Sequence, residues 1–489
     1  MTDTTARAGS NSLPAEAPTS SASAYDRSIV EGPLARAVWR LAWPTMLVNV
    51  IGGLQTLVDQ ILVGHLVGFA GNAAIGVSNQ VFIAVIIFIT SLFTGMSVLV
   101  ARFAGAGDVD AVNRTVYQAF ITAVGMSLLV MAPAGYVLAP WLLDLVNAAP
   151  AVRAEALPFL RIMFLTSSGM LVFYMLGGAL RSAGDARTPM ILGFVLTALN
   201  IALNVVLISG LGPIPAYGTA GAAMGTAIAS GTVATWAIVR LWRGGWVVQF
   251  PRGQDLKPDW AIIRELFRFG LPAGFQGIAM NVGGVLLLAF IGSLAESAAA
   301  QAAYSVGYGQ LFSFVTWTSI GLMGAAATVA GQNLGAGRPD RTAAGVHIAA
   351  RIGVTGAAIA GVLFFLVPRH LLAIFGLEDP VVVSIGTGLL RILSVSGLFI
   401  SAALTYTGGL QGTGDTKSPL YISIVSQIVL PLGICFVIQQ TGTLQPTHIW
   451  LAILLGHVVR FGLSYFRFVQ GKWRGIAVGI GSGARAREA

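Results

Sequence analysis

One carboxylate in this sequence stands inside an apolar stretch long enough to cross a membrane. Asp59 lies within residues 41–64, where an ionisable side chain costs free energy unless a partner, a proton or a cation compensates it. The other acidic residues fall in tails, loops or turns between apolar stretches. We therefore expect any chemistry within the membrane to involve Asp59.

Two amide side chains have the spacing needed to meet that carboxylate. Asn200 and Asn204 are four residues apart in the apolar stretch 189–210, so they share one face of a helix. Each amide has donors and an acceptor and can contact either a carboxylate or an ion. Carboxylate and amide oxygens suit a hard cation such as Na⁺, and a buried acid also suits proton exchange. The sequence predicts one coupling ion, leaves Na⁺ and H⁺ open, and predicts no cofactor and no metal beyond Na⁺ at Asp59.

The elements that position these side chains are expected to be membrane-spanning helices. Charged residues make up 10% of the chain, whereas about 25% is usual in globular domains. Backbone groups in lipid must be satisfied within their own segment, which favours helices. The twelve expected spans cover 41–64, 75–100, 116–139, 157–180, 189–210, 219–241, 267–292, 303–329, 345–367, 381–408, 419–440 and 448–469.

Co-ordered sequence matches show that the chain is an internal repeat. Each matched pair is separated by 228 or 230 residues, which a chance pairing of glycines does not explain. Six spans per repeat is an even number, so both halves enter the membrane from the same side. We expect an all-α membrane protein of two six-helix lobes, related by a pseudo-two-fold axis and enclosing a cavity where they meet. The matched residues are Pro44 and Pro272, Gly105 and Gly335, Arg161 and Arg391, and the turns 184–189 and 414–419.

The same offset separates a coupling role for Asp59 from a structural one. It maps Asp59 onto residues 287–289, and Asn200 and Asn204 onto Leu430 and Ile434, which are apolar positions. A structural polar cluster would be expected in both copies of a duplicated scaffold, whereas a coupling site is needed only once. The asymmetry therefore favours coupling.

Five regions are expected along the chain. Residues 1–34 are rich in Ser, Thr, Ala and Pro and lack the apolar core of a signal peptide, so they are expected to form a disordered cytoplasmic tail. The remaining regions are an N-lobe at 35–241, a cytoplasmic linker at 242–259, a C-lobe at 260–472 and a cytoplasmic tail at 473–489.

The repeated Gly-Asp turn has a local explanation. Gly184 or Gly414 is expected to end one helix, and Thr188 or Ser418 to cap the next, with the following proline at its first position.

Basic residues predict the orientation of the chain. The net charge of +9 comes from Lys and Arg that stand singly between apolar runs, so a nucleic-acid partner is not expected. With both termini in the cytoplasm, Arg153 and Arg369 lie in outer loops and a much larger set lies inside. The inner set comprises Arg36, Arg40, Arg102, Arg114, Arg181, Arg187, Arg243, Arg252, Lys257, Arg264, Arg338, Arg341, Lys417, Lys472 and Arg474.

Over residues 35–472 the chain resembles the multidrug and toxic compound extrusion (MATE) family. The resemblance is carried by the run 58–64, by both Gly-Ala-Gly hairpins, by both Gly-Asp turns and by residues 218–223. It implies two lobes forming a V and secondary active export of organic, often cationic, compounds in exchange for Na⁺ or H⁺. It also implies a multi-pass protein of the inner membrane and no enzyme activity. Asp59, Asn200 and Asn204 map onto the family's N-lobe cation site, which Thr226 also joins.

Several other residues could contact substrate or interior charge. Flexible thioethers and aromatic rings suit varied ligands, so Met280, Tyr304, Tyr308 and Trp317 are candidates for the substrate cavity. Snorkelling to the outer interface is the expected role of Arg161 and Arg391. His457 is more easily explained by packing than by proton relay.

Two other classes of function remain open from the sequence. A lipid-linked oligosaccharide flippase of the same superfamily would need a cationic cavity, and no basic cluster was found within the spans. An intramembrane enzyme would need paired carboxylates or clustered histidines, and the five histidines are dispersed. The expected partners are small organic molecules and the lipid bilayer, with the chain acting as a monomer. The sequence does not identify the substrate.

Overall fold

The computed structural model describes residues 25–250 and 257–478, which are helical apart from loops and one isolated bridge between Leu211 and Ile214. Eleven helices are long and apolar enough to span a membrane. A twelfth span is a helix pair bent by 55° at Thr166. The expected all-helical architecture with twelve spans is therefore confirmed.

The first six spans form the N-lobe. A π-helical segment at Ser127–Met131 joins α4 to α5, and α6 and α7 together make the bent span. The helices are α2 (Leu34–Leu66), α3 (Phe69–Ala106), α4 (Val109–Met126), α5 (Ala132–Leu145), α6 (Pro150–Leu165), α7 (Ser167–Ser182), α8 (Arg187–Ser209) and α9 (Gly218–Arg243).

The second six spans form the C-lobe. Two of them contain π-helical segments, at Ser305–Leu311 and Val425–Val429. The helices are α10 (Trp260–Gly292), α11 (Ser297–Tyr304), α12 (Phe312–Gly335), α13 (Pro339–Leu366), α14 (Pro368–Ala373), α15 (Pro380–Gly412), α16 (Lys417–Ile424), α17 (Leu430–Thr441) and α18 (Pro446–Val469).

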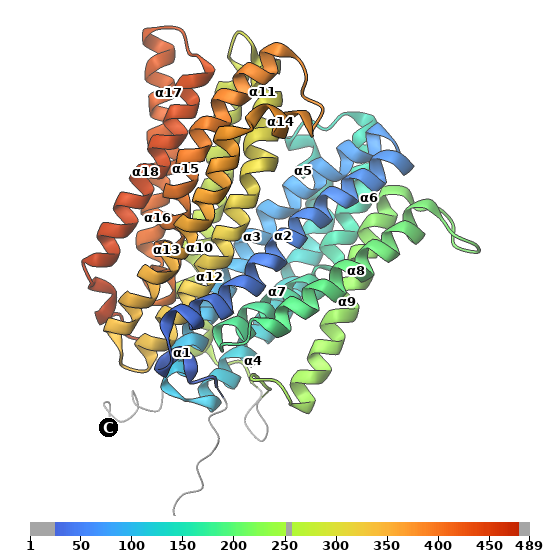
Figure 1. Ribbon diagram of the computed structural model, residues 1–489. Helices are drawn as coiled ribbons and strands as arrows, with labels where there is room; N and C mark the ends of the chain where they lie inside the picture. Colours follow the sequence, from blue (N-terminus) through green and yellow to red (C-terminus); the bar gives the residue numbers. More distant parts are fainter. Residues whose placement is uncertain (1–24, 251–256, 479–489) are drawn as a thin grey trace, which may run out of the picture.

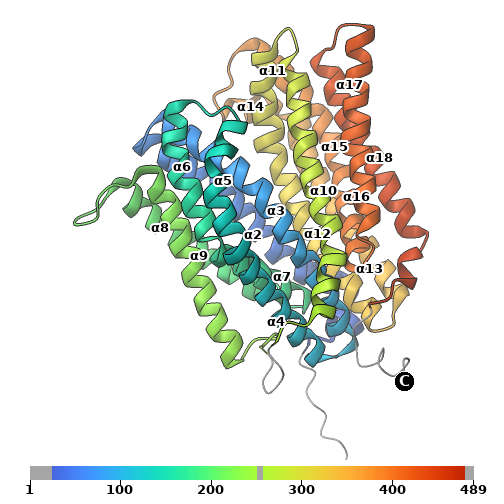
Figure 2. The ribbon, with the colours of Figure 1, turned by 180° about the vertical axis from the view of Figure 1, so that it is seen from behind.

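The two lobes meet at one end of the molecule, which we call the base. At the base lie the short helix α1 (Ser28–Glu31), the start of α2 and the end of α18 (Figure 1). The C-lobe helices stand nearly upright and the N-lobe helices lean away from them. The lobes therefore diverge toward the end of the molecule where α5 and α11 lie, opposite the base (Figure 2). Contacts between lobes are made chiefly by α2 with α12 and by α3 with α10 and α12.

The two Gly-Ala-Gly hairpins make a reciprocal contact at the base. An added Cβ at Gly105 would lie 1.9 Å from the carbonyl oxygen of Gln332, and one at Gly335 would lie 2.1 Å from that of Arg102. Only glycine permits so close an approach of two backbones. Gly105 and Gly335 are 230 residues apart, and so are Arg102 and Gln332, as the pseudo-two-fold axis requires.

Side chains beside these glycines repeat the reciprocity. The Gln332 amide donates to the carbonyl of Ser182 at 2.8 Å, and the Arg102 guanidinium donates to the carbonyl of Thr413 at 3.2 Å. Both acceptors lie where a span ends, next to a Gly-Asp turn. The base is thus closed by two symmetry-related sets of contacts.

The Gly-Asp turns differ from expectation in which residue caps the helix. Gly184 and Gly414 have φ of +103° and +96°, the left-handed conformation that favours glycine. The capping acceptor, however, is Asp185, whose Oδ1 accepts the backbone N–H of Arg187 and of Thr188 at 3.0 Å each. In the second turn Asp415 does the same for Ser418 at 3.1 Å. The expected caps, Thr188 and Ser418, instead donate their hydroxyls to these aspartates because a carboxylate is the stronger acceptor.

The expected tails and linker are described only in part. Residues 1–24 of the amino-terminal tail, 251–256 of the linker (with Arg252) and 479–489 of the carboxyl-terminal tail lie outside the described residues. In the described part of the first tail, Ile29 is buried and its carbonyl accepts a hydrogen bond from Asn333 at 3.3 Å. Phe250 of the linker is buried against Tyr117 of α4, with ring centroids 5.5 Å apart.

Candidate ion site and cavity

Asp59 lies on α2 within the N-lobe. Its Oδ1 accepts a hydrogen bond of 2.8 Å from the Asn204 amide of α8. Asn204 is fully buried, and Asp59 is half-buried and lines the cavity described below. The carboxylate is thus held by Asn204 of the neighbouring helix α8 and faces the cavity, where a ligand can reach it.

The four expected site residues form one hydrogen-bonded network across three helices. The Asn204 amide also lies 3.3 Å from the Asn200 Oδ1, one helical turn away on α8. Asn200 in turn donates to the hydroxyl of Thr226 on α9 at 3.0 Å. This hydroxyl donates to the carbonyl of Ala222 at 3.1 Å, which fixes its orientation.

Two residues of the network were not anticipated from the sequence. Gln55 donates to the Asn200 Oδ1 at 2.8 Å, and Thr197 donates to the Gln55 Oε1 at 2.7 Å. Gln55 stands one helical turn before Asp59, and Thr197 stands three residues before Asn200. Helical spacing from the expected residues makes both of them candidates, but the contact between α2 and α8 decides that they join the network.

One acceptor in the network has no hydrogen-bond partner among the residues that the structure describes. This atom, the Asn204 Oδ1, is buried and lies against α9, where an added Cβ at Gly225 would be 2.0 Å from it. Orphaned buried acceptors are rare in proteins and usually indicate strain or a missing ligand. The glycine at 225 allows α9 to pack this closely on the amide.

The donor set is made of hard oxygen atoms. Carboxylate, amide and hydroxyl oxygens come from Asp59, Gln55, Asn200 and Thr226. Such atoms suit Na⁺ or a proton and not a soft transition metal. Within residues 25–250 and 257–478, no group of three His, Cys, Asp or Glu side chains is arranged to hold a metal ion.

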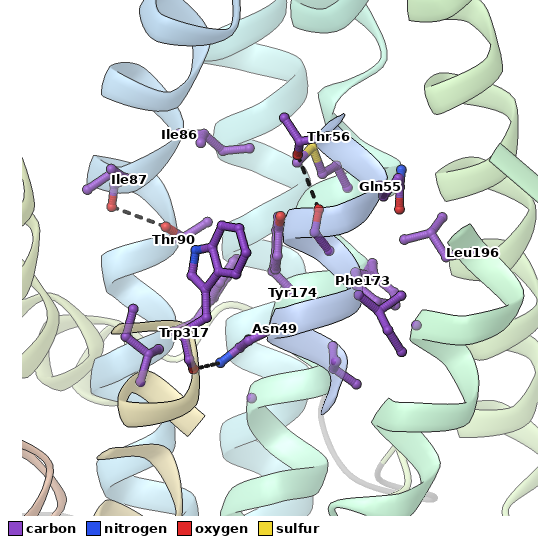
Figure 3. Close-up of a pocket in the computed structure, with 18 of the residues that line it drawn as sticks. Asn49, Gln55, Thr56, Ile86, Ile87, Thr90, Phe173, Tyr174, Leu196 and Trp317 are labelled. Carbon is purple, nitrogen blue, oxygen red and sulfur yellow. Dashed lines mark hydrogen bonds between the residues drawn. The ribbon is translucent and has the colours of Figure 1, made fainter. Parts of the chain in front are cut away.

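A cavity of about 930 Å³ adjoins this network, lined by N-lobe helices and by α12 and α15 of the C-lobe. The Trp317 ring projects between α2 and α3, and its carbonyl accepts a hydrogen bond from Asn49 at 3.2 Å (Figure 3). Phe173 and Tyr174 of α7 lie nearby (Figure 3). The wall is therefore aromatic beside a polar edge, as in many sites for amphipathic molecules.

The four residues expected to line a substrate cavity occupy different places. Trp317 lines the 930 Å³ cavity. Tyr304 and Tyr308 stack on each other in the C-lobe interior, with ring centroids 5.0 Å apart, and Tyr304 also stacks on Trp450 at 5.8 Å. Met280 is half-buried on α10.

The C-lobe buries polar side chains of a different kind. His457 and Arg460 lie one turn apart on α18, and both are at most 5% exposed. His457 Nδ1 shares a hydrogen bond with the Ser396 hydroxyl, and its ring stacks on Phe312 at 6.0 Å. The Arg460 Nε is buried and has no hydrogen-bond partner in the described part of the chain. Arg460 was not expected as an interior charge, although an arginine within a span is itself a signal.

The two outer arginines make matching cation–π contacts. Arg161 lies over Tyr136 at 4.4 Å from the ring centroid, and Arg391 lies over Phe365 at 5.8 Å. Tyr136 and Phe365 are 229 residues apart, which is within one residue of the repeat offset. Both arginines thus cover an aromatic ring in equivalent positions.

Known proteins resemble this chain along almost its whole length. The model of the family described as MatE matches residues 44–206 and 272–437. A probable multidrug resistance protein NorM of Thermotoga maritima is 27% identical over 449 residues, covering 90% of this chain and 93% of the relative. The multidrug resistance protein MdtK of Edwardsiella ictaluri is 25% identical over 440 residues, covering 86% and 92%.

Solved structures share the fold. A MOP superfamily transporter from Pyrococcus furiosus superposes with a TM-score of 0.83 at 20% identity, covering 92% of this chain and 98% of that one. An outward-facing multidrug resistance MATE family transporter gives 0.83 at 21% identity, covering 91% and 98%.

Proposed function

Because this chain belongs to the MatE family of multidrug transporters, we propose that it exports small organic molecules, often cationic, in exchange for Na⁺ or H⁺. The family consists of multi-pass membrane transporters and not of enzymes. Asp59 is the coupling acid in this proposal, and Asn200, Asn204 and Thr226 hold it.

The observation that carries the proposal is the placement of Asp59. Among the described residues that line the 930 Å³ cavity, Asp59 supplies the only carboxylate. It is bonded to Asn204, which belongs to a second helix. A change at Asp59 can therefore be transmitted to the packing of α2 against α8.

The coupling follows from the charge of the acid. An ion bound at Asp59 neutralises a charge that is costly inside the membrane, and loss of the ion restores the charge. Substrate and ion then favour opposite orientations of the lobes through a difference in free energy. The contacts at the base, Gly105 with Gln332 and Gly335 with Arg102, close one side in the state described by the structure.

We assign the base to the cytoplasm, so that the lobes diverge toward the outside. Arginines that lie at the base, such as Arg102, Arg338 and Arg341, support this orientation through the preference of basic residues for the inner side. In this assignment both termini are cytoplasmic, and the chain acts as a monomer in the inner membrane. A reporter that is active only outside the cytoplasm would be silent at the carboxyl terminus.

The test is drug efflux in inverted vesicles under separately imposed Na⁺ and H⁺ gradients. Asp59→Asn keeps the size of the side chain and its hydrogen bond but removes the charge, so gradient-driven efflux should fall to background while insertion stays normal. Asn200→Ala and Asn204→Ala should weaken coupling less because the charge remains. Wild-type rates in Asp59→Asn under a gradient would refute the role of the acid.

A further inference from the structure

The cavity beside Asp59 carries a second charge of opposite sign. Among its described lining residues, the charged side chains are Asp59 and Arg181. From the sequence Arg181 was assigned to the inner surface as a topology charge. The structure instead makes it part of the cavity wall.

Arg181 lies at the end of the cavity nearest the base. It stands in the last turn of α7, and its backbone carbonyl accepts a hydrogen bond from Thr328 of α12 at 3.3 Å. Asp59 lies much farther from the base: it is fourteen residues after Thr45, another lining residue. At a rise of about 1.5 Å per residue, this places Asp59 roughly 21 Å above Thr45. The Asp59 carboxylate and the Arg181 guanidinium therefore lie toward opposite ends of one cavity.

The fold does not require a charge at this position. The repeat-equivalent residue, 230 positions later, is Gln411, which also lines the cavity and donates to the Gln276 Oε1 at 3.2 Å. A neutral amide thus satisfies the same backbone position in the C-lobe. Within the part of the chain that the structure describes, Arg181 forms no ion pair. An unpaired guanidinium in the wall of a largely apolar cavity is costly unless something else compensates it.

Aromatic side chains lead along the wall to this guanidinium. Phe173 and Tyr174 precede Arg181 on α7 by eight and seven residues, which places them on the same side of the helix. Ser97 of α3 adds a hydroxyl to the lining, and Met170 of α7 adds a thioether. The inner part of the cavity is thus an apolar, aromatic slot that ends in a cation.

We propose that Arg181 binds an acidic group of the substrate, so that the exported compounds are amphipathic aromatic molecules carrying a carboxylate, zwitterions among them. A guanidinium suits a carboxylate because its planar fork can donate two parallel hydrogen bonds. The aromatic body of the molecule lies against Phe173, Tyr174 and Trp317, and Asp59 remains available to the coupling ion. This inference rests on the proposed export function and specifies the substrate for it.

The test compares two probes: a zwitterionic aromatic amine with one carboxylate, and its methyl ester, in which the carboxylate is capped and uncharged. Binding to the purified full chain is measured by calorimetry. Arg181→Gln installs the residue of the C-lobe and should lower affinity for the acid by about tenfold or more, since it removes the charge-assisted hydrogen bonds to the carboxylate. Affinity for the ester should not change, which also shows that the variant is folded.

Two further variants complete the design. Arg181→Lys keeps the charge but loses the fork, so it should retain part of the preference for the acid. Arg161→Gln removes an arginine at the outer end of the same span and should leave both affinities unchanged. Equal affinity of the wild type for acid and ester, or an equal loss of both in Arg181→Gln, would overturn the proposal.

The same probes separate this inference from the export function. Gradient-driven efflux of the ester by the wild type depends on Asp59 and not on Arg181. Efflux of ester without a preference for the acid would refute the substrate assignment alone. Absence of gradient-driven efflux for both probes, despite their binding, would refute the export function.

Discussion

The two lobes share a fold, but the N-lobe places an acidic side chain within its spans and the C-lobe places basic ones. In the N-lobe the buried polar network is built around an acid, Asp59, with amides from α8. The equivalent positions in the C-lobe include Leu430 and Ile434, and the buried polar side chains of that lobe include two basic ones on α18, His457 and Arg460. Duplication therefore kept the scaffold and left each interior free to specialise.

What the lobes kept in common is backbone and surface geometry. The Gly-Asp turns, the glycine contacts at the base and the outer cation–π pairs all recur at the repeat offset. What they did not keep is the ion network. We therefore infer that residues shared by the two repeats maintain the fold, whereas the residues of the ion network, which differ between the repeats, serve transport.

The largest effect is expected from a substitution on α9 that displaces Asn204 and so disturbs the network found only in the N-lobe. In Gly225→Ala the new Cβ would meet the Asn204 Oδ1, which lies 2.0 Å from its ideal position. Overpacking of this kind costs ~1–3 kcal/mol, so gradient-driven efflux should fall by about tenfold or more. Gly231→Ala on the same helix is the control, because nothing lies within 4 Å of its Cβ. Equal efflux in both variants would contradict the role of Asn204.

Substitution at the base should affect both lobes alike. Gly105→Ala and Gly335→Ala each force a methyl group against a carbonyl oxygen of the other lobe, so each should open the base and slow transport severalfold. Accessibility of a single cysteine at the base, introduced in a Cys435→Ala background, measures the opening. Gly356→Ala on α13 is the control, since its Cβ would meet no atom within 4 Å and the residue does not line the cavity. If only one of the two substitutions slowed transport, the two symmetry-related contacts would not contribute equally to closing the base.

The C-lobe histidine should matter for stability and not for coupling. His457→Gln removes the ring that stacks on Phe312 and weakens the hydrogen bond with Ser396. Thermal unfolding in detergent should show a loss of about 1–3 kcal/mol, the usual penalty for a buried polar group that loses its partner. Efflux under each gradient should stay near wild type. Loss of ion dependence in a stable variant would place a second coupling group in the C-lobe.

The smallest effects are expected at the outer arginines. Arg161→Gln and Arg391→Gln each lose a cation–π contact worth ~0.5–1 kcal/mol at exposed sites. The shift in melting temperature should be small in both, and larger for Arg161, whose guanidinium is closer to its ring at 4.4 Å against 5.8 Å. Unequal effects on efflux would indicate that one lobe uses its arginine in transport.

The repeat and the spans could be predicted because their signals are local. Left-handed backbone at 184 and 414 needs glycine, and apolar runs must be helical in lipid. The break at Thr166 could not be predicted, since its equivalent, Ser396, lies inside the continuous helix α15. Nothing in either residue type distinguishes a bend from a straight helix.

In the candidate ion site, too, some residues could be predicted from the sequence and others could not. An acid within a span is conspicuous in a sequence, and Asn200 and Asn204 follow from helical spacing. Gln55 and Thr197 are neutral, and such side chains often bond only to their own helix, as Thr232 does to the carbonyl of Ile228 at 2.7 Å. Their membership in the network depends on how α2 faces α8, which is a property of tertiary packing.

At the base, the contact of each glycine is with a main-chain carbonyl of the other lobe, and this affects how the sequence can drift. Every residue has a carbonyl, so the positions of Arg102 and Gln332 can accept different side chains while the contact with the opposite glycine remains. In this contact only Gly105 and Gly335 must stay small. Substitutions should therefore be poorly tolerated at these two glycines, around which each lobe could exchange its side chains for those that a new substrate demands.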